Sequence, residues 1–497
     1  MSLRASILKG GLKLGANQGV AQACAFVKNV ILARLISPEN FGVAATLAIT
    51  FNLFEMVSNL SSEILLVQAQ DGDDPRLQKT AQLLRAGRGL LNASLIFLLA
   101  GPVAGLFGAP ETAWAFRCLA VVPALRGFAH LDINRLQRNM NFGPLVISNI
   151  ASSVLVTLAA WPLAAYFRDY SAMLWLLVAQ AALSVIGSHL VAERRYGWTW
   201  DYAHARRIAS FGWPLLVNGL LLFVIFDGDR FVIGSAQKLF SRSTFSLADL
   251  GVYSVAFALA MAPTSLVASV AASLFLPMLS QVQTVRDQFQ KRYELCTQAI
   301  ALVSLTSAAG LIVAGGSLVV LIFGEKYAAA SSFIGIVGAM WGLRTLRTAP
   351  TLAAMALGDT KNSMVSNIAR SIALPGILLT AWAGYGLASI AICGLAGEAL
   401  AMFVCVWRLQ LQHNIPGAVA WKSFVMFASG TVAAGVVVWA GFASLNWRTA
   451  FLEATVVIAI LTLAMFWIFP GLRVALFRAE SSAMGLQCNA EDSAPAS

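Results

Sequence analysis

Several ionisable side chains lie inside long apolar stretches of this 497-residue sequence, where charged groups are costly and usually face a bundle interior or a water-filled cavity. Lys28, Arg126 and Arg230 are too deep in their stretches to reach the ends with ease. Positive charge at such depth suits an anionic ligand and disfavours a cationic one. Four further arginines lie within about a turn or two of a stretch end, where a long side chain can extend its charge into water. These are Arg34, Arg88, Arg117 and Arg347.

A polar stripe crosses one of these stretches, formed by Asn52, Glu55, Asn59 and Glu63. At about 100° per residue, these side chains fall within about 80° of one another on a helix that is otherwise apolar. Such a stripe cannot face lipid. Two interpretations remain open: the stripe lines a hydrophilic cavity, or it pairs with Lys28 on the neighbouring helix. The two carboxylates are also candidates to bind a coupling ion.

Asp227 and Arg230 lie three residues apart, so they share a helix face and could neutralise each other. Asp227 is a third candidate for ion coupling. Together with Asp229 it also spells the DxD pattern with which many glycosyltransferases hold a metal, but this triplet lies in an apolar stretch and a three-letter pattern is cheap to match. The histidines do not cluster, and neither HExxH nor GxxxxGK[ST] occurs. We therefore predict no catalytic residues, no metal site, no cofactor and no enzyme.

The elements that position these side chains must be membrane helices. Hydrophobic residues make up 58% of the chain and charged residues 11%, against about 45–50% and about 25% in soluble proteins. Apolar stretches of about 20 residues, each long enough to cross a bilayer, recur along the chain. The sequence predicts an all-α integral membrane protein of about fourteen transmembrane helices. The expected spans are 14–36, 42–67, 82–107, 112–133, 144–166, 171–192, 210–235, 250–280, 294–322, 329–350, 362–383, 386–410, 421–444 and 449–470.

Lys and Arg gather in alternate loops between these spans, which predicts one orientation with both termini in the cytoplasm. The net charge of +11 therefore reflects orientation, and we expect no nucleic-acid partner. The loops are short, so no soluble domain is expected. The longest outer loop, 236–249, is rich in Ser and Arg. The segment 471–497 is expected to be a disordered cytoplasmic tail.

A faint internal repeat relates residues 31–43 to residues 232–252: each passes from an apolar exit through a polar turn into a Gly-Val pair. Two six-helix halves followed by two extra helices would fit this repeat, and transporters are often built in this way. The predicted organisation is a cytoplasmic N-terminus (1–13), an amino-terminal lobe (14–192), a carboxy-terminal lobe (193–410), a final helix pair (411–470) and the tail.

Six segments, in order along the chain, carry a resemblance to a known family. They are LARLISPENFG (32–42), LQRNMNF (136–142), SFGWPL (210–215), DRFVIG (229–234), LGVYS (250–254) and FGEKY (323–327). With them the chain resembles the polysaccharide flippases of the multidrug/oligosaccharidyl-lipid/polysaccharide exporter superfamily, which include O-antigen and exopolysaccharide translocases. The 236–249 segment is longer than the usual turn, and its role stays open.

The resemblance implies two six-helix lobes around a cationic central cavity, and alternating access to a polyprenyl-pyrophosphate-linked oligosaccharide in a bacterial inner membrane. The residues implied to bind the substrate are Lys28, Arg34, Arg126, Arg230, Asn52 and Asn59. Glu55, Glu63 and Asp227 are the candidates for coupling to H⁺ or Na⁺. Expected partners are the lipid-linked substrate, membrane lipids, and a glycan polymerase with its export machinery. Two alternatives remain: an ion-coupled drug or cation antiporter of the same superfamily, and a membrane-bound glycan polymerase or ligase.

Overall fold

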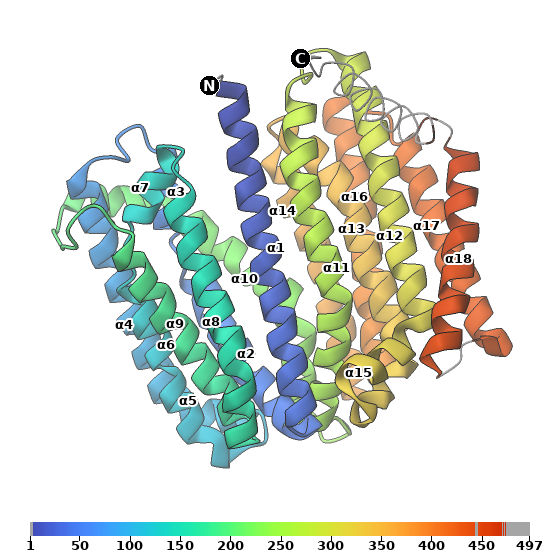
Figure 1. Ribbon diagram of the computed structural model, residues 1–497, viewed down its shortest axis with the longest axis horizontal. Coiled ribbons are helices and arrows are strands. Elements are labelled where there is room, and N and C mark those ends of the chain that lie inside the picture. Colours follow the sequence, from blue (N-terminus) through green and yellow to red (C-terminus); the bar gives the residue numbers. More distant parts are fainter. Residues whose placement is uncertain (1–2, 443–445, 470, 472, 474–497) are drawn as a thin grey trace, which may run out of the picture.

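A computed structural model describes residues 3–442, 446–469, 471 and 473, and within these ranges the chain is helical with no strand (Figure 1). We call the end of the molecule at which α1 (Leu3–Leu35) begins the inner end, and the opposite end the outer end. The predicted all-α membrane architecture is confirmed. The predicted tail, 471–497, falls almost wholly outside the described residues.

Eleven helices in the described ranges are long and apolar enough to cross a membrane, and a bent pair of helices makes twelve if it counts as one span. The bent pair is η2 (Glu325–Ser332) and α13 (Ile334–Ala356). The count of about fourteen is not confirmed and stays a prediction. The predicted span 14–36 lies in α1, which is not among the eleven. The predicted span 112–133 is divided into α5 (Ala113–Leu119) and α6 (Val121–Gly127), each too short to cross alone.

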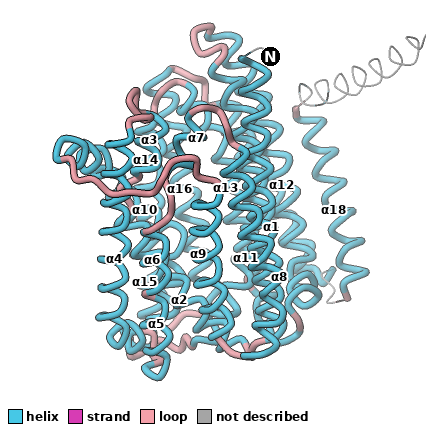
Figure 2. The backbone as a smooth tube through the Cα atoms, turned by 60° about the vertical axis from the view of Figure 1, so that its left-hand side comes forward, coloured by secondary structure: helices cyan, strands magenta, loops and turns pink. Residues whose placement is uncertain are grey.

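The helices form two groups with α1 between them in Figure 1. The first group contains α2 (Pro38–Ser58), α3 (Ser62–Gln68), α4 (Pro75–Leu106), η1 (Pro110–Thr112), α5, α6, α7 (Asp132–Arg138), α8 (Gly143–Phe167) and α9 (Ser171–Leu190). The second contains α11 (Leu247–Ser280), α12 (Arg286–Phe323), η2, α13, α14 (Thr360–Ser371), α15 (Ala373–Trp382), α16 (Leu387–His413), α17 (Ala418–Val437), η3 (Val438–Phe442) and α18 (Trp447–Ile468). Figure 2 shows α18 at one edge of the bundle. We refer to these groups as the amino-terminal and carboxy-terminal lobes.

Two helices join the lobes. α1 packs against α8 of the first lobe and against α11 of the second, and α10 (Tyr202–Leu239) packs against α2 and α4 on one side and α14 and α15 on the other. Side chains on α1 and α10 are therefore placed where the two lobes meet.

Polar turns with helix caps end the long helices at the outer end. The Ser37 hydroxyl caps α2 by accepting from the backbone N–H of Asn40, and Ser246 and Asp249 form a capping box at the start of α11. α10 continues to Leu239, so the turn is confined to 240–246 and is shorter than the predicted outer loop 236–249.

The segments of the predicted repeat meet at the outer end, where α2 crosses α11. A Cβ atom on Gly42 would lie 1.8 Å from the carbonyl oxygen of Leu247, and one on Gly251 would lie 2.1 Å from that of Pro38. Each glycine thus faces the residue four positions before its counterpart. Only residues without a side chain allow this approach, so the two glycines of the repeat let the lobes touch backbone to backbone.

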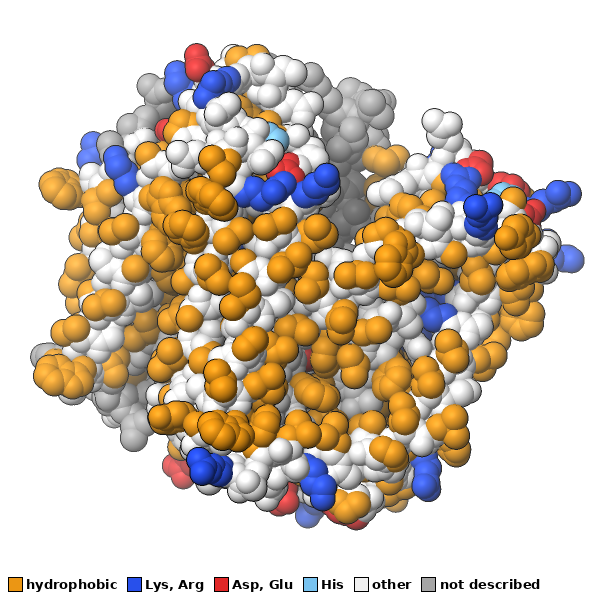
Figure 3. Space-filling model, turned by 180° about the vertical axis from the view of Figure 1, so that it is seen from behind, with side chains coloured by type: hydrophobic (Ala, Val, Ile, Leu, Met, Phe, Trp, Pro, Cys, Tyr) orange, Lys and Arg blue, Asp and Glu red, His pale blue; other side chains and the backbone are white. Residues whose placement is uncertain are grey.

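The face of the molecule in Figure 3 carries a broad hydrophobic band with Lys and Arg side chains gathered toward the two ends, as expected for a bilayer-spanning protein. The same view shows a notch between two masses that opens at the inner end. On this face the lobes are therefore apart at the inner end, while Gly42 and Gly251 keep them in direct contact at the outer end.

Candidate functional site

Lys28 on α1 and Arg126 at the end of α6 lie within electrostatic range of each other. Among the described residues, neither has a carboxylate oxygen within 4.0 Å. The guanidinium of Arg126 lies over the ring of Phe51, 4.8 Å from its centroid. The structure brings these two predicted cations together and leaves their charge without a directly paired acid.

Arg230 on α10 lies between the lobes. Its guanidinium forms an ion pair of 2.5 Å with Asp227, whose carboxylate also accepts a 3.3 Å hydrogen bond from Asn52 on α2. Arg230 also lies 4.4 Å from the ring centroid of Phe257 and is the charged residue lining a cavity of about 110 Å³ among α1, α2, α9, α10 and α11. Asp227 thus links both predicted substrate contacts, Asn52 and Arg230.

The two aspartates of the DxD triplet have separate partners. While Asp227 pairs with Arg230, Asp229 accepts a 2.8 Å hydrogen bond from the Tyr253 hydroxyl. Nowhere in the described ranges do three or more His, Cys, Asp or Glu side chains gather to hold a metal ion.

The polar stripe pairs with arginines of α4. Glu55 lies 3.0 Å from Arg88, and Glu63 lies 2.5 Å from Arg85. α2 ends at Ser58 and α3 begins at Ser62, and in this break the Asn59 side chain accepts a 2.8 Å hydrogen bond from the backbone N–H of Ser61.

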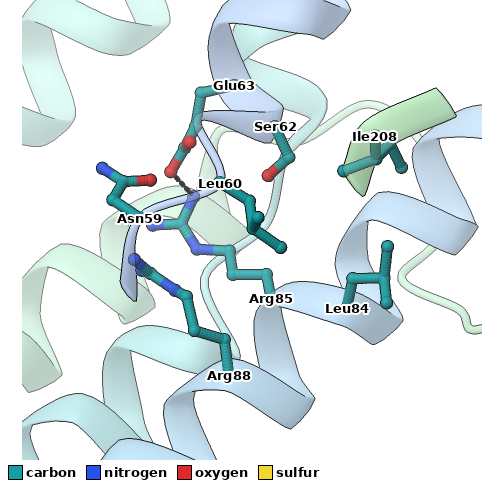
Figure 4. A pocket seen from close by; sticks show the side chains of 8 residues that line it. All are labelled: Asn59, Leu60, Ser62, Glu63, Leu84, Arg85, Arg88 and Ile208. Atoms are coloured by element: carbon teal, nitrogen blue, oxygen red, sulfur yellow. Dashed lines mark hydrogen bonds and ion pairs between the residues drawn. The ribbon is translucent and has the colours of Figure 1, made fainter. Parts of the chain in front are cut away.

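Figure 4 shows Arg85 and Arg88 reaching from α4 toward this break. The space they line is about 10 Å³, which is room for no more than about one water molecule. The two glutamates of the stripe therefore pair with arginines, not with Lys28, and the space beside Asn59 and Glu63 is closed to a larger ligand in this conformation.

Arg34 is separated from the other predicted substrate contacts. At the outer end its side chain donates hydrogen bonds to the carbonyl oxygens of Ile322, at 2.7 Å, and Leu321, at the end of α12. In return, Lys326 donates to the carbonyl oxygens of Arg34, at 2.9 Å, and Ile36. Arg34 thus caps the carboxyl end of α12, and Lys326 caps the carboxyl end of α1. The structure places Arg34 in this contact between α1 and α12.

A second cluster of buried charge, in the carboxy-terminal lobe, was not singled out from the sequence. Glu398 on α16 is fully buried and forms ion pairs with Arg344 and Arg347 of α13 and Arg370 of α14. The signal was a single acidic residue in the middle of the apolar stretch 386–410, which needs a cationic partner. The expectation that Arg88 and Arg347 extend into water is wrong, because each has a side chain only 10% exposed and faces a glutamate, Glu55 for Arg88 and Glu398 for Arg347.

Asp132 ties together the inner end of the amino-terminal lobe. Its fully buried carboxylate accepts hydrogen bonds from Arg135, at 2.6 Å, and from the backbone N–H groups of Glu193 and Arg194. Burial alone would raise the pKa of this carboxyl, but the hydrogen bonds outweigh burial and lower the pKa to about 2. Asp132 is the first residue of α7, and its hydrogen bonds tie the start of that helix to residues 193 and 194, which follow α9.

Comparison with known proteins agrees with this architecture. A family profile described as "Polysaccharide biosynthesis protein" matches residues 31–332. The chain is 27% identical over 326 residues to the succinoglycan biosynthesis transport protein ExoT of Rhizobium meliloti, covering 64% of this chain and 63% of ExoT. It is 20% identical to the lipopolysaccharide biosynthesis protein WzxC of Escherichia coli, covering 66% and 65%, and 22% identical to the teichuronic acid biosynthesis protein TuaB of Bacillus subtilis, covering 59% of each. Each match spans less than two thirds of the relative's length.

Solved structures show the same fold. The lipid II flippase MurJ, in an inward closed conformation, superposes with a TM-score of 0.69 at 13% identity, covering 90% of this chain and 97% of MurJ. An inward-facing multidrug resistance transporter of the MATE family, in the MOP superfamily, superposes with a TM-score of 0.63 at 12% identity, covering 80% and 95%. At these identities the likeness concerns the fold.

Proposed function

The chain belongs to the polysaccharide biosynthesis protein family, and from this premise we propose that it is a flippase for a polyprenyl-diphosphate-linked oligosaccharide. It would carry the substrate across a bacterial inner membrane by alternating access, with both termini in the cytoplasm. The relatives named for succinoglycan, lipopolysaccharide and teichuronic acid synthesis support an O-antigen or exopolysaccharide repeat unit as the cargo. A glycan polymerase and its export machinery would receive the product.

The observation that carries this proposal is the unpaired positive charge of Lys28 and Arg126 inside the membrane helices. The diphosphate of the substrate is anionic and its sugars are hydroxylated, so the headgroup needs a polar, positive path while the polyprenyl tail stays in lipid. Lys and Arg form charge-assisted hydrogen bonds with phosphate oxygens. Arg230, at the cavity between the lobes and paired with Asp227, would offer a further guanidinium donor toward the outer end.

The arrangement of the lobes supports alternating access. The notch of Figure 3 opens at the inner end, while Gly42 and Gly251 hold the lobes in contact at the outer end. With the inner end in the cytoplasm, this is an inward-facing shape, and the substrate would enter from the leaflet where it is made. Parting of the glycine crossing would open the outer side.

Asp227 is the best-placed candidate for a coupling ion. Its carboxylate is 1% exposed and contacts both Asn52 of the amino-terminal lobe and Arg230 on α10, so a proton or Na⁺ there would change the contact between that lobe and α10. Glu55 and Glu63 are each held by an arginine within the amino-terminal lobe. Dependence of flipping on a pH or Na⁺ gradient that is lost in Asp227→Asn would support this role. Gradient dependence retained in that variant would exclude it.

Reconstituted vesicles test the proposed function. The probe is a polyprenyl diphosphate carrying a short fluorescent oligosaccharide, and the readout is the rate at which a membrane-impermeant enzyme gains access to it. We expect flipping far above that of protein-free vesicles, and a loss of at least tenfold in Lys28→Ala and Arg126→Ala. Arg448→Ala, which removes a cation from the start of α18, is the matched control. Wild-type protein that moves lipophilic cations but no lipid-linked sugar would instead identify an antiporter, and polymerised product would identify an enzyme.

A further inference from the structure

The carboxy-terminal lobe contains a compact group of charges that the proposed function does not yet use. We call Arg344, Arg347, Arg370 and Glu398 the arginine cluster. The Glu398 carboxylate lies 2.6 Å from Nε of Arg344, 3.4 Å from Nε of Arg347, and in direct contact with Nε of Arg370. Three guanidinium groups therefore share one carboxylate, which leaves the cluster with an excess of two positive charges.

This excess is held away from water. The side chains of Arg344, Arg347 and Arg370 are 11%, 10% and 8% exposed, and Glu398 is not exposed. Arg344 and Arg370 also donate to the carbonyl oxygen of Ile225 on α10. Uncompensated charge at such depth is expensive, and it persists where it serves a ligand or a water-filled path.

The donors of the cluster are only partly used. Within the described chain, Nη1 of Arg344 is buried without a hydrogen-bond partner, and Oε2 of Glu398 faces Nε of Arg347 without forming a hydrogen bond. Arg347 makes long contacts of 3.3 Å to Ser366 and 3.4 Å to Asn367. Since buried donors are normally satisfied, the free donor of Arg344 indicates an acceptor that arrives with a ligand.

A cavity adjoins these donors. About 220 Å³ of space lies among α10, α13 and α14, lined by Arg344 and Arg347 together with the polar side chains of Thr348, Thr351 and Asn367. Phe226 forms part of its wall, and the Arg344 guanidinium lies 4.8 Å from the centroid of that ring. The cavity thus offers two guanidinium groups, hydroxyl groups and an amide on one side of α10, the helix that joins the lobes.

We propose that the arginine cluster is a diphosphate-binding site, and that its occupant is the diphosphate of the lipid-linked substrate. Each phosphoryl group of a diphosphate diester carries one negative charge at neutral pH, so the ligand matches the excess of two positive charges. The planar guanidinium groups of Arg344 and Arg347 suit paired phosphate oxygens. This inference rests on the proposed function and adds a second site, in the carboxy-terminal lobe, to the cations Lys28 and Arg126.

Equilibrium binding to the purified full-length protein tests the site without requiring transport. The probe is undecaprenyl diphosphate bearing one radiolabelled N-acetylglucosamine, presented in detergent micelles. We expect Arg344→Gln and Arg347→Gln to weaken binding by about 10- to 100-fold, the usual effect of losing a hydrogen bond to a charged group. Arg408→Gln is the control, because it removes a cation of the same lobe that pairs with Asp359 away from the cavity. It should bind as tightly as wild type.

Asn367→Asp provides a test of the site even if the arginine variants fail to fold. It places a carboxylate beside Arg347 without removing a guanidinium group, so the protein should melt at or above the wild-type temperature while binding weakens at least tenfold. A merely structural role of the cluster predicts the melting effect alone. Unchanged binding in Asn367→Asp and in whichever arginine variants fold would overturn the site.

Two further outcomes separate this inference from the proposed function. If the wild-type protein flips the lipid-linked sugar but binding does not depend on Arg344 and Arg347, the proposed flippase function stands and the proposed site is refuted. If the protein flips nothing but binds the probe through these arginines, the proposed site is supported and the proposed flippase function is refuted. Equal competition by inorganic pyrophosphate would assign the site to free diphosphate and overturn the lipid headgroup as its occupant.

Discussion

Glu398→Gln should destabilise the protein strongly, because it leaves three buried guanidinium groups without their shared carboxylate. At an effective dielectric constant of about 20, unit charges about 4 Å apart attract by about 4 kcal/mol. Three such contacts give a gross attraction on the order of 12 kcal/mol, from which the lost hydration and the repulsion among the arginines are subtracted. Removing one partner of a buried ion pair costs about 3–5 kcal/mol in measured cases, and we expect a loss of that size.

Thermal unfolding in detergent measures this loss. Glu111→Gln, which removes an exposed carboxylate from the outer turn before α5, is the control and should melt like wild type. The double variant Glu398→Gln/Arg370→Gln removes one of the three uncompensated charges, so it should be more stable than Glu398→Gln alone by at least about 1 kcal/mol. Added diphosphate should also raise the melting temperature of Glu398→Gln more than that of wild type, since the ligand then supplies the missing negative charge.

Wild-type melting of Glu398→Gln would refute the reasoning, because the carboxylate would then not be the counter-ion of the cluster. Strictly additive effects of the two substitutions would refute the coupling between Glu398 and Arg370.

Three further predictions concern the outer end, the inner end and the orientation. Gly42→Ala should slow flipping at least tenfold in the vesicle assay, since its Cβ would meet the Leu247 carbonyl oxygen at 1.8 Å, whereas Gly87→Ala, which meets nothing within 4 Å, should flip normally. Asp132→Asn should lower the free energy of unfolding at pH 7 by about 2–3 kcal/mol. Because the Asp132 pKa is depressed to about 2, wild type should lose this advantage as pH falls from about 4 toward 2, which unfolding at several pH values measures. A reporter fused after Arg473 should be active only as a cytoplasmic fusion; periplasmic activity would contradict the predicted orientation.

The membrane helices follow from the sequence because a bilayer requires long apolar segments and leaves little choice of backbone structure. The prediction of individual spans is weakest where apolarity alone cannot show whether a segment forms one continuous helix. Residues 112–133 are apolar enough for one span, but the chain breaks between α5 and α6 near Ala120. α1 carries Lys28 together with the uncharged polar residues Asn17, Gln18, Gln22 and Asn29, and it is not among the clearly apolar spans.

Contacts between distant helices were harder to predict. The helical period predicted one polar face for Glu55 and Glu63, but the structure divides them between α2 and α3. Their partners on α4 lie more than twenty residues away in the sequence and depend on tertiary packing. Distance from a span end also gave the wrong exposure for Arg347, because the burial of a side chain depends on the neighbouring helix as well as on its depth in the membrane. A search for every acid within an apolar stretch would have found Glu398, whose partners must then be sought among the intramembrane arginines.

The distribution of charge over the two lobes bears on how a substrate could pass between them. In the amino-terminal lobe, Glu55 and Glu63 have arginine partners, while Arg126 of that lobe and Lys28 on the adjacent α1 keep unpaired positive charge among the described residues. The arginine cluster around Glu398 carries a similar excess in the carboxy-terminal lobe. A transported ligand must be held firmly enough to enter and weakly enough to leave. If the arginine cluster binds the diphosphate as proposed, Glu398 would compete with the ligand for the same guanidinium groups and weaken a grip that three bare arginines would make too tight. Similar excess charge on both sides would then let the headgroup move between the lobes without a deep trap on either side.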